Sequence, residues 1–484
     1  MGLLGILLAL FFLIFFAYRG WSILLLPPLA AILAALTAGQ PLLAHWTLTF
    51  MSSAAGFVAQ FFPLFLLGAL FGKLMDDSGS LKTIAEFMTR KLGPQRAVLA
   101  VVLSGAIVTY GGVSLFVAFF VLVPMAHALF KAGNISHRLM PAAIVLGTST
   151  FTMTALPGTP SIQNTIPTPF FGTTPFAAPG LGLIASAIML GFGLWWLSRI
   201  EHKARSLGMG YEVTNAQAHE SAAEDVLVRE RASTAREFDP AELHRGNHSA
   251  VQPGILIAVL PLIVVLLGNL SMSLLILPRM NASYLADPSW GSTNLSAIGG
   301  IWAVLTALIA AIVCLLALNA KRMPALRESI DAGANAAVLP VLSVASLVGF
   351  GSVVAALPAF ASVRESLLSL QGGPLVSLAV TTNVLAALTG SASGGLTIAL
   401  QALAPTYNQL SAAFGIDPAL MHRVAVIGAG TLDSLPHNGA VVSVLALCGA
   451  THGESYQDIV MVGIVGPIAA LIAVIVLGST LGSF

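Results

Sequence analysis

The stretch Thr431-Leu432-Asp433-Ser434-Leu435-Pro436-His437-Asn438-Gly439 decides the fold of this chain. It lies near the middle of an apolar run over residues 422–450, which is long enough to form a membrane-spanning helix. A carboxylate, an imidazole, a proline and a glycine are tolerated at that depth only where they face protein or a water-filled cavity. The stretch therefore predicts a helix that is broken inside the membrane at a functional site.

The composition indicates a polytopic membrane protein. The chain has 484 residues, of which 57% are hydrophobic and only 8% are charged, and its mean hydropathy is +0.90. Soluble domains carry about 25% charged residues, so this composition excludes a soluble globular protein. The apolar runs are long and continuous, which favours α-helical spans over a β-barrel. The expected fold class is therefore an all-α polytopic membrane protein.

About ten crossings and two re-entrant hairpins account for the apolar runs. Most runs are uninterrupted, but those at 138–171 and 422–450 are broken near their centres by Pro and Gly. Residues 97–130 and 374–410 each consist of two short apolar arms joined by a turn rich in glycine, which permits a tight reversal of the chain. We interpret both segments as re-entrant hairpins, and a pair of short spans is the alternative for each.

The positions of the basic residues support this arrangement. All Lys and Arg residues except Arg279, Arg364 and Arg423 fall on one side of the predicted membrane. Positive charge marks the cytoplasmic side. The polar segment 199–250 is therefore predicted to be a cytoplasmic linker, and both termini are predicted to lie on the opposite side. No Lys or Arg is expected within a span, and Arg423 comes closest.

The same architectural features occur twice, 279 residues apart. Pro157 corresponds to Pro436, and the hairpin tip Tyr110–Ser114 corresponds to Thr389–Ser393. Each copy orders them alike: a hairpin with a glycine-rich tip, followed by a helix broken at Leu-Pro.

Residues 1–198 and 251–484 then form two repeat units. Each unit has an odd number of crossings, about five, so the second is inverted relative to the first, as in many secondary transporters. The two hairpin tips and the two helix breaks would meet near the midplane. Free helix N-termini there suit an anion, and free carbonyl ends suit a cation or a proton carrier.

Asp433 is the strongest candidate for ion coupling. A carboxylate at the bilayer centre costs about 3 kcal/mol even on the lenient insertion scale, so some function or contact must offset that cost. Burial disfavours the charged form, which suits a proton acceptor. Alternatively, Asp433 caps the second half of the broken helix by accepting backbone N–H groups, and the two roles are compatible. His437 is a second candidate for proton transfer or substrate binding, with a structural hydrogen bond as the alternative.

Substrate binding is predicted at the hairpin tips and at both helix breaks. Hydroxyl, amide and imidazole groups and exposed glycine backbone mark the candidates: Tyr110, Gly111, Gly112, Ser114, Gly158, Thr159, Ser161, Thr389, Gly390, Ser391, Ser393, His437 and Asn438. Small polar residues also mediate helix packing in membranes, so each has a structural alternative. The first break carries no ionisable group, so we assign ion coupling to Asp433 and His437.

The sequence contains no phosphate-binding loop, no zinc-protease motif and no pair of haem or quinone ligands at depth. The two cysteines predict neither a disulfide nor a metal site. We therefore expect a transporter that is not an enzyme, with no cofactor, no bound metal and no nucleic-acid partner.

Two motifs, Val108–Val117 and Leu435–Ala440, resemble those of the gluconate permease (GntP) family of the ion transporter superfamily. The resemblance covers essentially the whole chain except residues 199–250. It implies secondary uptake of sugar acids and related hydroxy acids, generally with protons, across a bacterial inner membrane. It also implies a scaffold domain and a mobile transport domain that moves as an elevator, in a homodimer.

The chain departs from the best-known gluconate members of this family. It lacks their acidic residue near the first hairpin tip, and it resembles more closely the group that includes 3-hydroxybutyrate carriers. The leading hypothesis is therefore a proton-coupled importer of gluconate, 3-hydroxybutyrate or another small hydroxy or keto monocarboxylate. A sodium-coupled carboxylate symporter or an antiporter on the same fold is the alternative.

Overall fold

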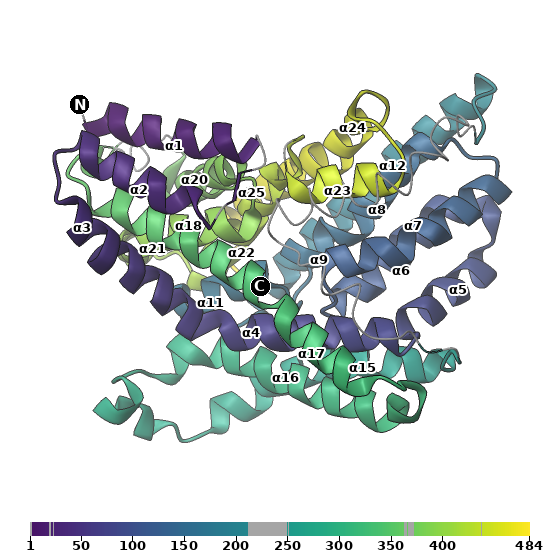
Figure 1. The fold of residues 1–484 in the computed structure, drawn as a ribbon, viewed down its shortest axis with the longest axis horizontal. Coiled ribbons are helices and arrows are strands. Elements are labelled where there is room, and N and C mark those ends of the chain that lie inside the picture. The colour runs from purple at the N-terminus through teal and green to yellow at the C-terminus, as the bar shows by residue number, and fades with distance from the viewer. Residues whose placement is uncertain are drawn as a thin grey trace.

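A computed structural model of the chain describes residues 2–18, 21–22, 24–211, 249, 251–362, 365, 372–436 and 438–484. Every regular element within these residues is a helix (Figure 1). The predicted site residue His437 lies outside the described residues, as does most of the predicted linker.

The helices before the predicted linker include both long rods and short pieces. They are α1 (Gly2–Tyr18), α2 (Leu26–Thr37), α3 (Leu42–Ala44), the π-helical turn η1 (His45–Phe50), α4 (Met51–Asp77), α5 (Ser80–Leu92), α6 (Ala97–Tyr110), α7 (Leu115–Ala132), α8 (Met140–Thr148), α9 (Phe151–Thr154), α10 (Ile162–Thr165), α11 (Pro167–Phe171) and α12 (Pro179–Ser206).

The helices after the linker again include both long rods and short pieces. They are α15 (Ile255–Ser271), α16 (Leu295–Asn319), α17 (Leu326–Ala336), α18 (Val338–Ala356), α20 (Gly373–Thr389), α21 (Ala392–Phe414), α22 (Pro418–Thr431), the 3-10 turn η9 (Leu432–Ser434), α23 (Gly439–Leu447), α24 (His452–Val460), the π-helical turn η10 (Met461–Val465) and α25 (Gly466–Leu481).

Seven helical segments of the described residues are long and apolar enough to cross a membrane, or eight if the bent pair α5–α6 counts as one span. At 1.5 Å per residue, the 28 residues of α12 rise about 42 Å, which exceeds a hydrocarbon core of about 30 Å. The α5–α6 pair is bent by 102°. α7 is among the seven, so by length it can cross, and the count of ten crossings stays a prediction.

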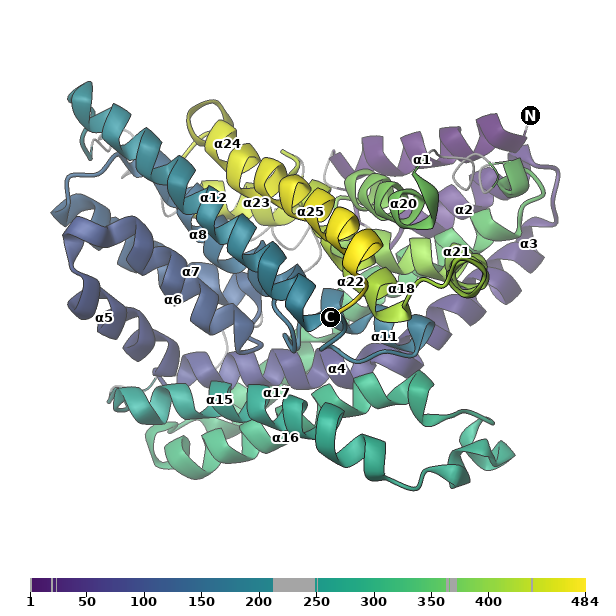
Figure 2. The ribbon, with the colours of Figure 1, turned by 180° about the vertical axis from the view of Figure 1, so that it is seen from behind.

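The long helices frame the structure, and the broken helices fill its centre. α15 and α16 pack against each other and run along one edge, beside α4 (Figure 1). α1, α2 and α3 lie at one end of the molecule, and α5, α6 and α7 lie at the other, as the view from behind also shows (Figure 2). α4 passes between these two ends and contacts α16, α17 and α18.

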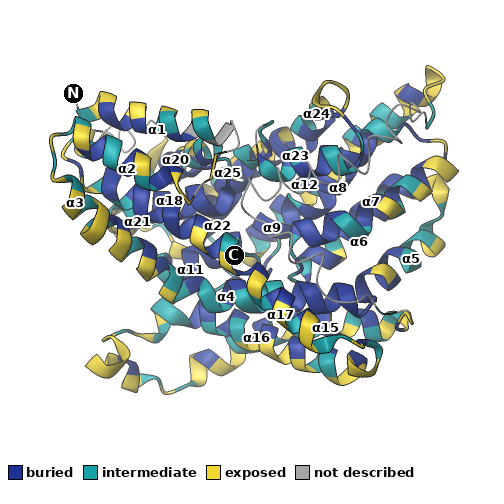
Figure 3. Ribbon diagram, viewed as in Figure 1, coloured by how far each residue is buried: buried dark blue, intermediate teal, exposed yellow. Residues whose placement is uncertain are grey.

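Burial is greatest around the broken helices (Figure 3). Every residue of α22 from Leu420 to Thr431 is buried, and so is every residue of α8. Large apolar side chains such as Leu4, Phe11 and Leu256 are instead exposed on the outer helices. Those exposed apolar side chains are what a lipid-facing surface requires.

Among the described residues, two basic side chains, those of Lys73 and Arg423, are buried within helices. Lys73 is 1% exposed inside the span candidate Leu42–Asp77, and its ammonium lies 2.9 Å from a carboxylate oxygen of Asp77. Arg423 is fully buried in α22. Both charges are tolerated because each is partnered by protein groups rather than exposed to lipid.

Candidate functional site

The first helix break is a run of short helices interrupted by prolines. α8 ends at Thr148, and α9, α10 and α11 follow as separate pieces of four or five residues. Pro157 and Pro160 lie in the gap between α9 and α10, where proline cannot continue a helix. Ser161 begins α10 by accepting a hydrogen bond from the backbone N–H of Asn164.

The tip of the first hairpin packs against this break. Tyr110 ends α6, and its hydroxyl donates a hydrogen bond of 2.8 Å to the carbonyl of Pro157. Gly112 has a φ of +100°, and a Cβ there would lie 2.9 Å from Cγ of Pro160. Glycine is therefore required both for the backbone conformation and for the close approach of the tip to the break.

The second break is joined to the tip of the second hairpin by Asp433 and Asn438. Oδ1 of Asp433 accepts hydrogen bonds of 2.8 Å from the backbone N–H of Ala392 and from the side-chain amide of Asn438. That amide also donates to the carbonyl of Gly390, at 2.8 Å. The carboxylate thus lies at the N-terminus of α21, where the helix dipole favours negative charge.

The structure corrects the expected capping role of Asp433. The alternative to ion coupling was that Asp433 caps the second half of its own broken helix, but the residue that caps α23 is Asn438, whose Oδ1 accepts from the backbone N–H of Ala440. Asp433 instead caps α21, on the facing hairpin. The reason is that η9 turns the chain before Pro436, so the carboxylate points toward the hairpin tip.

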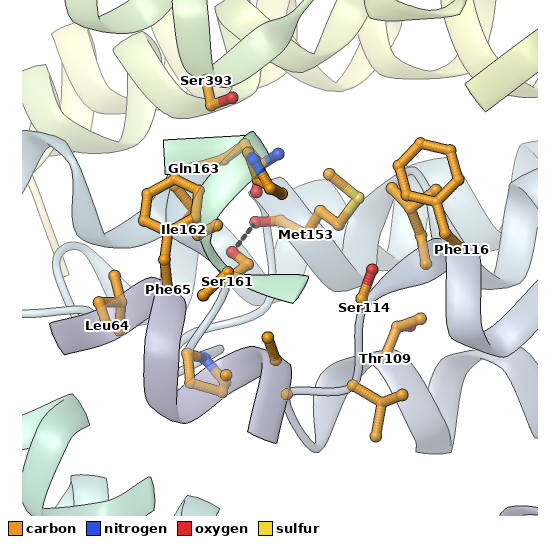
Figure 4. Close-up of a pocket in the computed structure, with 18 of the residues that line it drawn as sticks. Leu64, Phe65, Thr109, Ser114, Phe116, Met153, Ser161, Ile162, Gln163 and Ser393 are labelled. Carbon is orange, nitrogen blue, oxygen red and sulfur yellow. Dashed lines mark hydrogen bonds between the residues drawn. The ribbon is translucent and has the colours of Figure 1, made fainter. Parts of the chain in front are cut away.

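A cavity of about 140 Å³ lies between the first hairpin tip, the first break and α4 (Figure 4). A cavity of about 150 Å³ holds a molecule the size of benzene. Its polar lining consists of hydroxyls and one amide: Thr109, Ser114, Thr148, Ser161, Gln163 and Ser393. No charged side chain of the described residues lines it. An anion in the cavity would therefore rely on helix ends and neutral donors.

Four predicted site residues line this cavity, namely Gly112, Ser114, Ser161 and Ser393. Ser114 and Ser393 are equivalent positions of the two hairpins, 279 residues apart, and here they border one cavity. Others do not line it: Tyr110, Gly111, Gly158, Thr159, Thr389, Gly390, Ser391, Asp433 and Asn438. Four of these nine residues, Tyr110, Gly390, Asp433 and Asn438, form the hydrogen bonds between tips and breaks.

Several of these residues have local structural roles. Ser391 caps α21 by accepting from the backbone N–H of Gly394, and the hydroxyl of Thr389 donates to the carbonyl of Leu385 in its own helix. Thr159 is fully buried, and its hydroxyl has no hydrogen-bond partner among the described residues.

Arg423 is a central residue that the sequence indicated only weakly. Its Nε and Nη2 donate to the carbonyl of Ala177, at 3.1 and 2.7 Å, and Nη1 donates to the carbonyl of Thr154, at 3.1 Å. Nη1 also donates to Oδ1 of Asn164, at 3.2 Å. The guanidinium therefore binds the second broken helix to the first break, and it does not line the cavity. In the sequence, the signal for Arg423 was the placement of a basic residue early in an apolar run.

Gln163, Thr109 and Thr148 are cavity residues that the sequence analysis did not select. Thr109 and Thr148 lie inside helical arms, where a hydroxyl ordinarily bonds its own helix. Among the described residues, no cluster of three or more His, Cys, Asp or Glu side chains could hold a metal ion.

Comparison with known proteins adds independent findings. The protein-family model described as GntP family permease matches residues 1–168 of this chain. Over 492 residues, covering 100% of both chains, the sequence is 40% identical to the "Uncharacterized transporter YxjC" of Bacillus subtilis (strain 168).

Two solved structures share the fold. Neisseria gonorrhoeae MtrF, described as illuminating a class of antimetabolite efflux pumps, matches with a TM-score of 0.56 and 14% identity, over 90% of this chain and 85% of that chain. The Alcanivorax borkumensis YdaH transporter, described as having an unusual topology, matches with a TM-score of 0.50 and 17% identity, over 89% and 88%. At these identities the likeness concerns the fold alone.

Proposed function

Because the chain belongs to the GntP permease family, we propose that this membrane transporter takes up a small organic monocarboxylate together with protons. The substrate class is a hydroxy or keto acid such as gluconate or 3-hydroxybutyrate. A small cavity lined by hydroxyls and an amide supports this class, because such groups bind the hydroxyl and carboxylate oxygens of a small acid.

The position of Asp433 is the observation that carries the proton coupling. Its carboxylate holds the backbone N–H of Ala392, and the next residue, Ser393, lines the cavity. Protonation would remove the negative charge and weaken this charge-assisted hydrogen bond. Binding of a proton to Asp433 would thereby change the hydrogen bonding of a hairpin tip at the edge of the cavity. His437 remains a second candidate for the proton path, on the basis of the sequence.

The larger architecture is part of the same proposal. α6 ends at Tyr110 and α20 ends at Thr389, again 279 residues apart, which supports two inverted repeat units over 1–198 and 251–484. We place the hairpins and broken helices in a mobile transport domain that moves as an elevator against a scaffold. In this proposal the protein is a homodimer in the bacterial inner membrane, with both termini outside the cytoplasm.

Uptake by proteoliposomes tests the proposal. In sodium-free buffer, a proton gradient directed into the vesicles should make the wild-type protein accumulate labelled 3-hydroxybutyrate or gluconate above its equilibrium concentration. Asp433→Asn keeps a side chain of the same shape without a titratable group, and it should lose accumulation while retaining part of the exchange of internal for external substrate. Full accumulation by Asp433→Asn would refute the coupling role.

Sodium coupling is the second candidate, and the same cluster of atoms favours it. The carboxylate of Asp433 and the carbonyl of Gly390 both bond the amide of Asn438, so their oxygens lie close together. Hard cations bind carboxylate and carbonyl oxygens. Accumulation that requires a sodium gradient and ignores the proton gradient would select this candidate and overturn proton coupling.

A further inference from the structure

The two hairpin helices that border the cavity begin in different ways. At the N-terminus of α21, Ser391 accepts from the backbone N–H of Gly394, at 3.3 Å, and Asp433 accepts from that of Ala392, at 2.8 Å. At the N-terminus of α7, Ser114 is the capping residue, but its side chain forms no capping hydrogen bond. One helix end is therefore already matched with a carboxylate, and the other is not.

The uncapped end belongs to the cavity. Ser114, Leu115 and Phe116, at the start of α7, line it. α7 has 18 residues, so its N-terminus carries the partial positive charge of a full helix, equivalent to about half an elementary charge. Backbone N–H groups and this charge suit one carboxylate.

Gln163 independently points to a ligand at the same place. Its side chain is only 7% exposed, lines the cavity, and forms no hydrogen bond among the described residues (Figure 4). The amide is not fully enclosed by protein, so it can bond a group in the cavity. A ligand oxygen in the cavity would satisfy it, whereas the neighbouring hydroxyl of Ser161 already donates to the carbonyl of Met153, at 2.7 Å.

Charge limits what the cavity accepts. With no charged side chain in its lining, the start of α7 is the main compensation available to an anion. A second ligand carboxylate would have to lie at the start of α21, where Asp433 is bound. Two carboxylates at one site repel each other, so the protein's own carboxylate takes the place of a second ligand carboxylate.

We propose that the cavity selects organic acids with a single carboxylate, and that Asp433 excludes dicarboxylates by occupying the start of α21. The ligand carboxylate lies at the start of α7, and Gln163 bonds the substrate's hydroxyl or keto oxygen. This inference rests on the proposed function, because it specifies the substrate of that same site.

Ligand binding to the purified full-length protein tests this selection. Thermal shifts with 3-hydroxybutyrate and with succinate yield the two affinities. The wild type should bind 3-hydroxybutyrate and show no shift with succinate at the same concentration. Asp433→Ala vacates the start of α21, so its affinity for succinate should rise about tenfold or more, the value of one hydrogen bond to a charged group.

Asp417→Ala is the matched control. Asp417 also caps a helix, by accepting from the backbone N–H of Ala419 at 2.8 Å, but it is exposed at the start of α22. Removing it should leave the preference for monocarboxylates unchanged. Gln163→Leu should weaken binding of 3-hydroxybutyrate about tenfold, with little change in the melting temperature of the ligand-free protein.

Wild-type protein that binds succinate as tightly as 3-hydroxybutyrate would overturn the inference, and so would Asp433→Ala protein with unchanged affinity for succinate. If Asp433→Ala cannot be purified, the affinity of Asp433→Ser for succinate and the comparison of the two ligands on the wild type still test the inference. Binding needs no ion gradient, so failure of proton-driven uptake alone would refute the coupling and leave this inference standing. Absence of binding by every monocarboxylate would refute the proposed substrate class itself.

Discussion

Replacing Arg423 by Met should destabilise the protein because two buried carbonyls lose their hydrogen-bond donors. The carbonyls of Thr154 and Ala177 accept from the guanidinium and have no other hydrogen-bond donor among the described residues. Methionine fills a similar space but donates nothing. Each buried carbonyl left without a partner costs about 1–3 kcal/mol, so the pair costs about 2–6 kcal/mol. Relief from burying a charged group offsets part of this cost.

The melting temperature of the ligand-free protein in detergent measures the effect. Arg423→Met should lower it by roughly 5 °C or more. Arg423→Lys keeps the charge but loses the planar fork of donors, so its melting temperature should lie between those of the wild type and Arg423→Met. Arg205→Met is the matched control, because Arg205 forms an exposed pair with Glu201 worth about 0–1 kcal/mol. If Arg423→Met has the same melting temperature as Arg205→Met, Arg423 does not hold the two breaks together.

Two further substitutions test the packing of the hairpin tip and the buried ion pair. Gly112→Ala should reduce uptake and lower the melting temperature, because its φ of +100° and the close proline cost about 1–3 kcal/mol. Gly56→Ala, inside α4 with open space around its Cβ, should lower neither, and equal losses would refute the steric argument. Lys73→Met or Asp77→Asn alone should cost about 3–5 kcal/mol by leaving one charge buried without its partner. The double variant should be more stable than either single variant in the same melting assay, and additive losses would contradict the coupling of the pair.

Membrane helices were predictable from the sequence because hydrocarbon allows few alternatives for a buried backbone. Apolar runs, Pro157 and Pro436 indicated where helices lie and where two of them break. Glycine at position 112 indicated the tight hairpin tip. The resemblance to the family followed from two motifs, and the family model together with the 40% identical transporter confirms it.

Which polar groups face the cavity could not be predicted from the sequence. Ser114 and Ser161 face the cavity, whereas Tyr110 bonds the first break, because a side chain's direction depends on contacts between segments far apart in the chain. Asp433 reaches a hairpin 41 residues away for the same reason. Arg423 was expected near a membrane surface, yet the carbonyls of the first break satisfy its charge in the interior.

Proton movement accompanying substrate tests most directly whether Asp433 couples proton binding to uptake. Proteoliposomes in sodium-free buffer would carry a pH-sensitive dye in the lumen, with protein-free liposomes correcting for leakage of the free acid. Adding 3-hydroxybutyrate or gluconate outside, with no preset gradient, should acidify the lumen of wild-type vesicles and not of Asp433→Asn vesicles. Labelled substrate entering wild-type vesicles without acidification, or equal acidification by Asp433→Asn, would contradict this coupling.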